Sequence, residues 1–176
     1  MRPDVEHWVL SVFREQAMDI DMAQLTTITT ELLALGAVDV AELYSAPRFS
    51  ARAIEFRLRP GFSVDLSTRR PSDGSAWDMD RDEDAMELKL LQATQKPALL
   101  TISPPCEFFS ALLNIRKPVE ERKARKVLGR RHLEVSIAAA RRQLDAGRHF
   151  LFAHPWSASS WKEQILIDFM AKLRVI

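Results

Sequence analysis

The sequence contains very little cysteine and glycine: one cysteine, Cys106, and five glycines among 176 residues. A single cysteine excludes a disulfide within the chain and is typical of a reducing compartment. No stretch approaches the roughly 18 uninterrupted apolar residues that a transmembrane helix needs. The first residues, MRPDVEHWVLSVFREQ, carry charges inside their apolar stretch, unlike a secretory signal. We therefore expect an intracellular protein, in the nucleus or the cytoplasm, with no membrane partner.

An excess of charge of one sign is also absent. The 25 Lys and Arg residues and the 24 Asp and Glu residues give a formal net charge of +1, which argues against a long acidic or basic tail. Hydrophobic residues make up 47% of the chain. A domain of roughly 150 residues can hide about two-thirds of its unfolded surface. We therefore expect one folded domain with at most a short appendage.

The spacing of apolar residues changes period several times along the chain. Residues 1–36 have apolar positions at helical spacing and are predicted to form an N-terminal helical appendage. Beyond them the strand-like segments are predicted at 38–45, 59–67, 76–79, 97–103 and 148–155. The helix-like segments are predicted at 49–58, 85–95, 130–147 and 160–173. Strands that alternate with helices favour right-handed βαβ units and a parallel sheet.

Residues 37–176 are therefore expected to form an α/β domain with a Rossmann-like, mainly parallel sheet of about five strands and helices on both faces. In such sheets a ligand binds outside the carboxyl ends of the strands. The predicted strand ends carry carboxylates, a thiol and an imidazole, on the side chains of Glu42, Asp65, Asp78, Cys106 and His154. The sequence thus predicts a ligand site at this edge of the sheet.

The segment around Cys106 resembles a known catalytic loop. Residues 104–110 read Pro-Pro-Cys-Glu-Phe-Phe-Ser, similar to the Pro-Pro-Cys-Gln-x-Phe-Ser loop of cytosine-5 DNA methyltransferases. Residues 42–45, Glu-Leu-Tyr-Ser, resemble the Asp-Leu-Phe-Ser end of that family's first strand. Residues 152–156, Phe-Ala-His-Pro-Trp, are also similar to methyltransferase-like segments of some retroelement-derived polyproteins. The resemblance covers about residues 38–160.

This resemblance implies the N-terminal half of a class I methyltransferase domain that uses S-adenosylmethionine as its cofactor. Its cysteine nucleophile would be Cys106, which would attack C6 of a cytosine in DNA and so activate C5 for methylation. The cofactor contacts it implies are Glu42, Tyr44, Ser45, Asp65, Asp78 and Pro104. The sequence leaves RNA open as the substrate instead of DNA. A flipped or single-stranded base would be required in either case.

The sequence departs from the family's pattern in three places. Residues 45–48, Ser-Ala-Pro-Arg, replace the glycine-rich turn, and Ala153-His154-Pro155 replaces a strand end that carries a glutamate. The predicted sheet has about five strands where the family has seven, which leaves the strand at 148–153 at or near an edge. A second hypothesis is therefore a catalytically decayed domain that binds nucleic acid or supports assembly. Either a homodimer or a larger parent polypeptide would cover the exposed edge.

Residues 116–131 carry eight basic and two acidic side chains directly after the cysteine loop. We expect a loop there, in which Arg116, Lys117, Arg122 and Lys123 contact phosphates; the alternative is a solvated loop without a partner. Each site residue also has an ordinary structural alternative: a buried thiol for Cys106, a salt bridge for Glu42, a turn cap for Asp65, a solvated loop for Asp78 and a structural histidine for His154. No histidine stands at a metal-ligand spacing from the cysteine, so no metal site is expected.

Overall fold

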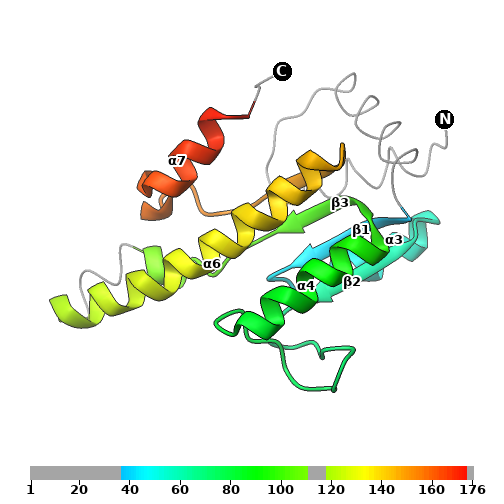
Figure 1. Ribbon diagram of the computed structural model, residues 1–176, viewed down its shortest axis with the longest axis horizontal. Helices are drawn as coiled ribbons and strands as arrows, with labels where there is room; N and C mark the ends of the chain where they lie inside the picture. Colours follow the sequence, from blue (N-terminus) through cyan, green and yellow to red (C-terminus); the bar gives the residue numbers. More distant parts are fainter. Residues whose placement is uncertain (1–36, 111–117, 174–176) are drawn as a thin grey trace.

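The computed structural model describes residues 37–110 and 118–173, and an all-parallel four-stranded sheet lies at its centre (Figure 1). The strands are β1 (Val38–Leu43), β2 (Pro60–Val64), β3 (Pro97–Ile102) and β4 (His149–Phe152), in the order β2-β1-β3-β4. The expected parallel α/β architecture is therefore confirmed at this coarse level. The helices predicted over residues 1–36 lie outside the described residues.

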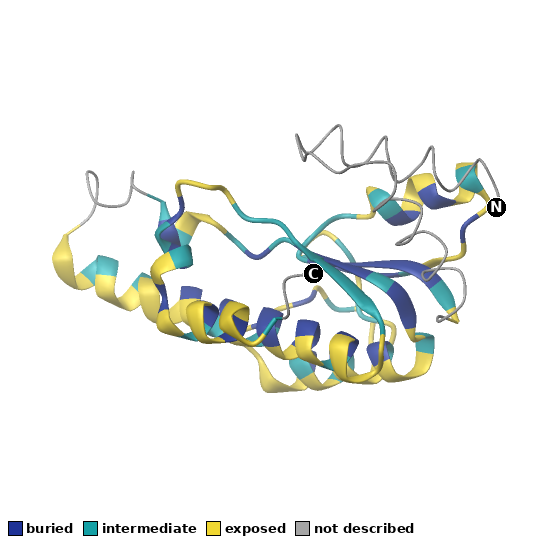
Figure 2. Cartoon of the chain, turned by 90° about the horizontal axis from the view of Figure 1, so that it is seen from above, coloured by how far each residue is buried: buried dark blue, intermediate teal, exposed yellow. Residues whose placement is uncertain are grey.

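Helices cover both faces of the sheet. They are α3 (Phe49–Ala53), α4 (Asp82–Gln95), α6 (Val119–Asp145) and α7 (Gln164–Ala171), with short 3-10 turns η1 (Ile54–Phe56), η2 (Glu107–Phe109) and η3 (Ser159–Lys162). Helices α4 and α6 lie against one face and α3 against the other (Figure 2). This division follows from right-handed crossovers, because the chain moves from β1 to β2 in one direction and returns past β1 to β3.

The core lies between the sheet and the α4–α6 layer. Alternate residues of β1 and β3 point into it, namely Ala41, Leu43, Leu100 and Ile102, and all four are fully buried. They pack with Leu88 of α4, Ile137 of α6 and Phe169 of α7. Helix α7 thereby packs beside β4, which pairs only with β3 among the described residues.

The strand order fixes where a ligand can bind. The connection after β1 runs to one side of the sheet, toward β2, and the connection after β3 runs to the other side, toward β4. The loops that leave β1 and β3 therefore diverge and open a crevice at the carboxyl edge. This is the topological switch point at which open parallel α/β sheets bind their ligands.

The prediction of about five strands is wrong for the described residues, because residues 76–79 form no strand of the sheet. Trp77 and Met79 are buried while Asp78 is exposed, so the segment has the alternating pattern of a strand without a partner. Within residues 37–110 and 118–173, its only ladder contact is an isolated bridge between Arg69 and Ala76. The predicted strand at 59–67 also ends early, and Leu66 is 78% exposed.

The basic segment after the cysteine loop is helical from Val119 onward, so the loop predicted there is wrong over residues 119–131. Pro118 precedes the helix, and Glu120 and Glu121 lie in its first turn, where negative charge favours the helix dipole. Gly129 lies inside this helix and is buried. Among the described residues, no helix is long and apolar enough to cross a membrane.

Candidate functional site

A cavity of about 410 Å³ lies at the switch point, bounded by the loops that follow β1, β2 and β3. Four carboxylate side chains line this acidic cavity: Asp65, Asp78, Asp80 and Glu107. Rings line it as well, among them Tyr44, Phe108 and His132. The structure thus brings together three of the residues that the sequence assigned to cofactor binding, Tyr44, Asp65 and Asp78.

Tyr44 and His132 both line this cavity and are in contact, although they lie 88 positions apart in the sequence. Tyr44 has a left-handed backbone (φ 60°), and its hydroxyl lies 3.1 Å from Nδ1 of His132. The His132 Nε2 atom lies 3.7 Å from Oδ1 of Asp80, and the Phe108 ring stacks on the imidazole at 5.4 Å between centroids. Sequence analysis missed His132, Asp80 and Phe108, since no local pattern links a helical histidine to a strand end.

Burial controls the protonation of this pair. It raises the pKa of the Tyr44 hydroxyl above its usual range, and nearby Asp80 raises it further. Burial also lowers the pKa of the His132 imidazole, an effect that Asp80 and Asp78 oppose. At neutral pH the tyrosine is therefore protonated and the histidine neutral. The acidic cavity consequently gains no positive charge from His132.

Asp65 and Asp78 each hold a turn with one carboxylate oxygen. Oδ1 of Asp65 accepts hydrogen bonds from the Ser67 backbone N–H (2.9 Å) and hydroxyl (2.6 Å). Oδ1 of Asp78 accepts one from the Asp80 backbone N–H (3.0 Å). The turn-cap interpretation of Asp65 is therefore confirmed. Such a cap does not exclude ligand binding, because the second oxygen of each carboxylate makes no hydrogen bond within the described residues.

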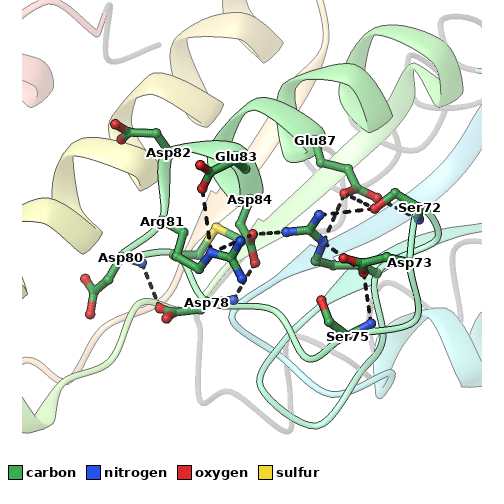
Figure 3. Close-up of polar contacts among 12 residues, drawn as sticks. Ser72, Asp73, Ser75, Asp78, Asp80, Arg81, Asp82, Glu83, Asp84 and Glu87 are labelled. Carbon is green, nitrogen blue, oxygen red and sulfur yellow. Dashed lines mark hydrogen bonds and ion pairs between the residues drawn. The ribbon is translucent and has the colours of Figure 1, made fainter.

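A buried ion-pair network positions the loop that carries Asp78 (Figure 3). Asp84, fully buried at the start of α4, pairs with the Arg70 guanidinium and accepts a 2.6 Å hydrogen bond from the Asp78 backbone N–H. Arg70 also contacts Asp73 at 3.3 Å and Glu87 at 3.2 Å. These acids pair with Arg70 and bind the loop backbone, whereas the Asp78 side chain lines the acidic cavity.

A second cavity, of about 530 Å³, lies on the other side of the loop after β3. This thiol cavity is lined by Cys106 together with Ser103, Pro104, Phe152, Ala153, His154 and Pro155. Cys106 is exposed, so the alternative of a buried apolar thiol is wrong. His154 follows β4 and therefore meets the cysteine loop at the carboxyl edge of the sheet, as the strand ends predicted.

His154 is half-buried among three aromatic rings, those of Phe109, Phe152 and Trp161, at 6.0–6.3 Å between centroids. Burial lowers the pKa of its imidazole, and a contact with the Pro104 backbone opposes that shift. Neither ring nitrogen has a partner with hydrogen-bond geometry within the described residues. His154 therefore lines the thiol cavity, but both of its ring nitrogens are buried.

The loop after β3 separates the two cavities, and its residues alternate between them. Pro105 and Glu107 line the acidic cavity, Pro104 and Cys106 line the thiol cavity, and Ser103 borders both. The loop begins at a hydrogen bond from the Ser103 N–H to the Leu43 carbonyl (3.0 Å). Any two ligands bound in these cavities would therefore contact opposite sides of the same five residues.

Three predicted cofactor residues do not line the acidic cavity. Glu42 is fully buried and accepts hydrogen bonds from the Ser50 N–H (2.7 Å), the Arg48 N–H (3.0 Å) and the Ser45 hydroxyl (2.8 Å). It thereby caps the start of α3 and holds the turn that replaces the glycine-rich loop. Ser45 is bound to Glu42, and Pro104 belongs to the thiol cavity.

The basic side chains of α6 are largely paired within the chain. Arg130 and Lys126 contact Glu163 at 2.7 and 3.5 Å, and that contact joins α6 to the start of α7. Other pairs follow the same pattern: Arg131 with Asp82, Arg125 with Glu107, and Lys123 with Glu120. Arg122 lies half-buried on the same helix, and Arg116 and Lys117 lie outside the described residues. No described group of His, Cys, Asp and Glu is arranged to hold a metal ion.

Comparisons of the chain with protein-family models, with curated proteins and with solved structures found no match. The site must therefore be interpreted from its own residues. Those residues form two adjoining cavities at one switch point, one acidic and ring-lined, the other holding an exposed thiol and an unsatisfied imidazole.

Proposed function

We propose that this chain is an S-adenosylmethionine-dependent methyltransferase-like domain that acts on cytosine in DNA, with Cys106 as the nucleophile. One observation carries the proposal: the acidic cavity, with Asp65 and Asp78 from successive segments, adjoins the cavity of the exposed Cys106 across a single loop. The resemblance of the cysteine loop to the methyltransferase loop supports the same assignment.

The charge of the acidic cavity supports a sulfonium cofactor over a phosphate-bearing one. Four carboxylates line this cavity, and none of its lining residues is Lys or Arg. A dinucleotide or nucleoside triphosphate would bring negative charge toward these acids, whereas S-adenosylmethionine carries a sulfonium and an ammonium group. The backbone N–H groups at the start of α3 are also unavailable to a phosphate, because Glu42 already accepts from them.

Shape and hydrogen-bonding capacity fit the nucleoside part of this cofactor. The cavity volume falls in the range of about 300–1,000 Å³ that small-molecule sites occupy. Asp65 would accept from ribose hydroxyls and Asp78 from the adenine amino group, as the resemblance implies. The Tyr44 and Phe108 rings offer apolar surface for a base. When bound, the cofactor would supply an electrophilic methyl group.

Cys106 would perform the covalent step from the thiol cavity. Its thiolate would add to C6 of the cytosine and open the C5–C6 double bond, so that C5 could attack the sulfonium methyl group while the S–CH3 bond breaks and the neutral thioether leaves. Loss of the C5 proton and departure of the thiolate then restore the double bond. His154, neutral at pH 7, lines the same cavity, and a hydrogen bond from it to the edge of the base would require one of its buried ring nitrogens to become accessible.

Calorimetry with S-adenosylmethionine tests the cofactor half of the proposal. Asp65→Asn and Asp78→Asn should each weaken binding about 10- to 100-fold, because a hydrogen bond to a charged group contributes about 1.5–3 kcal/mol. Asp168→Asn, an exposed substitution of the same kind on α7, serves as the matched control and should leave the affinity unchanged. Equal affinity in all four proteins would contradict the assignment of the acidic cavity.

Trapping with 5-fluorocytosine tests the nucleophile. An oligonucleotide that contains this base should form an adduct with the wild-type chain that survives denaturing electrophoresis, provided the cofactor is present. Cys106→Ser should form none. An adduct that persists in Cys106→Ser would exclude Cys106 as the nucleophile. It would also mean that a group other than a thiol had reacted, since the chain has no other cysteine.

One observation favours a second candidate, a decayed domain that keeps its ligand sites without the chemistry. Cys106 lines a different cavity from the acids, and the loop after β3 separates the two. Cofactor binding without an adduct on any cytosine-containing substrate would support this binding module. An adduct that depends on Cys106 would exclude it.

A further inference from the structure

Trp156 is almost completely exposed at the rim of the thiol cavity. It is 95% accessible and directly follows Pro155, which lines that cavity. The other two tryptophans among the described residues are mostly covered: Trp77 is 2% exposed and Trp161 is half-buried. The largest apolar side chain of the 20 thus faces solvent beside a cavity.

The backbone that carries Trp156 is held in place. The Pro155 carbonyl accepts hydrogen bonds from the Ala158 N–H (3.0 Å) and from the Trp161 indole N–H (2.8 Å). The first bond closes a turn with Trp156 near its tip, and the second ties that turn to η3. Trp156 is therefore presented by a fixed turn, and a ligand that stacks on it would order only one side chain.

The cavity next to this indole offers a complementary partner for a planar heterocycle. His154 lines this cavity with both ring nitrogens buried, and Phe152 and the prolines of the cavity supply apolar walls. A nucleobase has flat faces that can pack against such walls and stack on an exposed indole.

Charge favours a single strand over a duplex as the source of that base. The basic side chains of α6 that would contact duplex phosphates are engaged by Glu163, Asp82 and Glu107. Binding to duplex DNA depends on neutralising many phosphates. Stacking on an aromatic side chain instead needs an exposed base face, which a single strand offers and a duplex covers.

We propose that Trp156 and the thiol cavity together form a stacking site for single-stranded nucleic acid. One base enters the cavity beside Cys106 and His154, and a neighbouring base stacks on the Trp156 indole. The inference rests on the proposed function for the identity of the base in the cavity, and it adds the single-stranded substrate and the platform that selects it.

Fluorescence anisotropy of the full chain with labelled 12-nucleotide single-stranded DNA, single-stranded RNA and duplex DNA tests this inference. Trp156→Ala should weaken single-strand binding about 5- to 100-fold, the effect of losing one base–aromatic stack. Trp156→Phe keeps a ring and should retain most of the affinity. Met86→Ala, 71% exposed on α4, is the control for losing an exposed apolar side chain and should change nothing. Thermal unfolding of each variant verifies the fold.

Alkylation of Cys106 by iodoacetamide then locates the bound strand. The oligonucleotide should slow alkylation in the wild-type chain and protect less at the same concentration in Trp156→Ala. The inference is overturned by equal single-strand affinity in wild type and Trp156→Ala, by tighter binding of the duplex, or by a bound strand that leaves the thiol unprotected. Trp156-dependent binding and protection without any cofactor affinity would uphold this inference while contradicting the proposed methyl transfer.

Discussion

Gly129 provides the sharpest test of how the cysteine loop is positioned. This glycine lies inside α6, where the η2 turn that follows Cys106 packs directly onto the helix. A Cβ atom at position 129 would lie 2.6 Å from Cβ of Phe108 and 2.8 Å from Cε2 of Phe109. Side-chain rotation cannot relieve the first contact, because the Cβ of Phe108 is fixed by its backbone. Gly129→Ala should therefore push η2, and Cys106 with it, away from the helix.

Two opposing effects decide the sign of the change in stability. Alanine is favoured over glycine inside a helix by about 1 kcal/mol. Overpacking of a well-packed site costs about 1–3 kcal/mol. Because three contacts fall below 3.0 Å and the Phe109 ring is only 2% exposed, the upper end of that range applies. The expected net loss is about 2 kcal/mol, or about 4–8 °C in Tm for a chain of this size.

Urea unfolding and the alkylation rate of Cys106 together measure this prediction. Gly129→Ala should lower the free energy of unfolding by about 2 kcal/mol, with an unchanged slope, and should alter the reactivity of the single thiol. Ala138→Gly, at an exposed position of the same helix, measures the difference in helix propensity between alanine and glycine. It should lower the free energy of unfolding by about 1 kcal/mol. A Gly129→Ala protein more stable than the wild type would refute the close approach of η2 to α6.

The remaining predictions concern the loop and the ring contact of the acidic cavity. Asp84→Ala should lower the free energy of unfolding in urea, because it removes a fully buried carboxylate that pairs with Arg70 and accepts from the Asp78 backbone N–H; Glu83→Gln, an exposed acid of the same turn, should change it little. Because burial lowers the pKa of His132 in the folded state, stability should be full above pH 6.5 and decline as the pH falls below it, where the unfolded chain binds the proton more readily. His132→Gln should reduce that decline, as thermal unfolding between pH 5 and 8 would measure; an identical decline in the variant would contradict it.

The parallel sheet and the positions of its acids could be predicted because they depend on local patterns. Strands β1 and β3 are short apolar runs bounded by loops with prolines, and parallel strands place all their carboxyl ends at one edge. That rule is sufficient to bring Asp65 and Tyr44 to a common cavity, whereas Asp78 reaches the cavity from a segment that forms no strand of the sheet. The same local reasoning failed at residues 76–79, where Trp77 and Met79 alternate with exposed residues because they cover the core, not because they pair.

Contacts between distant segments could not be predicted from these patterns. The role of Gly129 could not be predicted, because its chain neighbours give no sign that Phe108 and Phe109 need the space of a missing side chain. The Tyr44–His132 contact joins a strand end to the middle of a helix. The split into two cavities likewise depends on which side each residue of the cysteine loop faces, and no periodicity encodes this.

The loop between the cavities links the two halves of the proposed site. It is anchored at its start by the hydrogen bond from Ser103 to the β1 carbonyl of Leu43, and beyond Cys106 by the bond from the Ser159 hydroxyl to the Phe109 carbonyl (3.0 Å). Both anchors lie outside the alternating segment, and the hydrogen bond from the Phe109 N–H to the Cys106 carbonyl (3.0 Å) holds its end. A ligand in the acidic cavity would contact Pro105 and Glu107, which are the chain neighbours of Cys106. Under the proposed function, the cofactor and the base would therefore bind on opposite sides of one anchored loop.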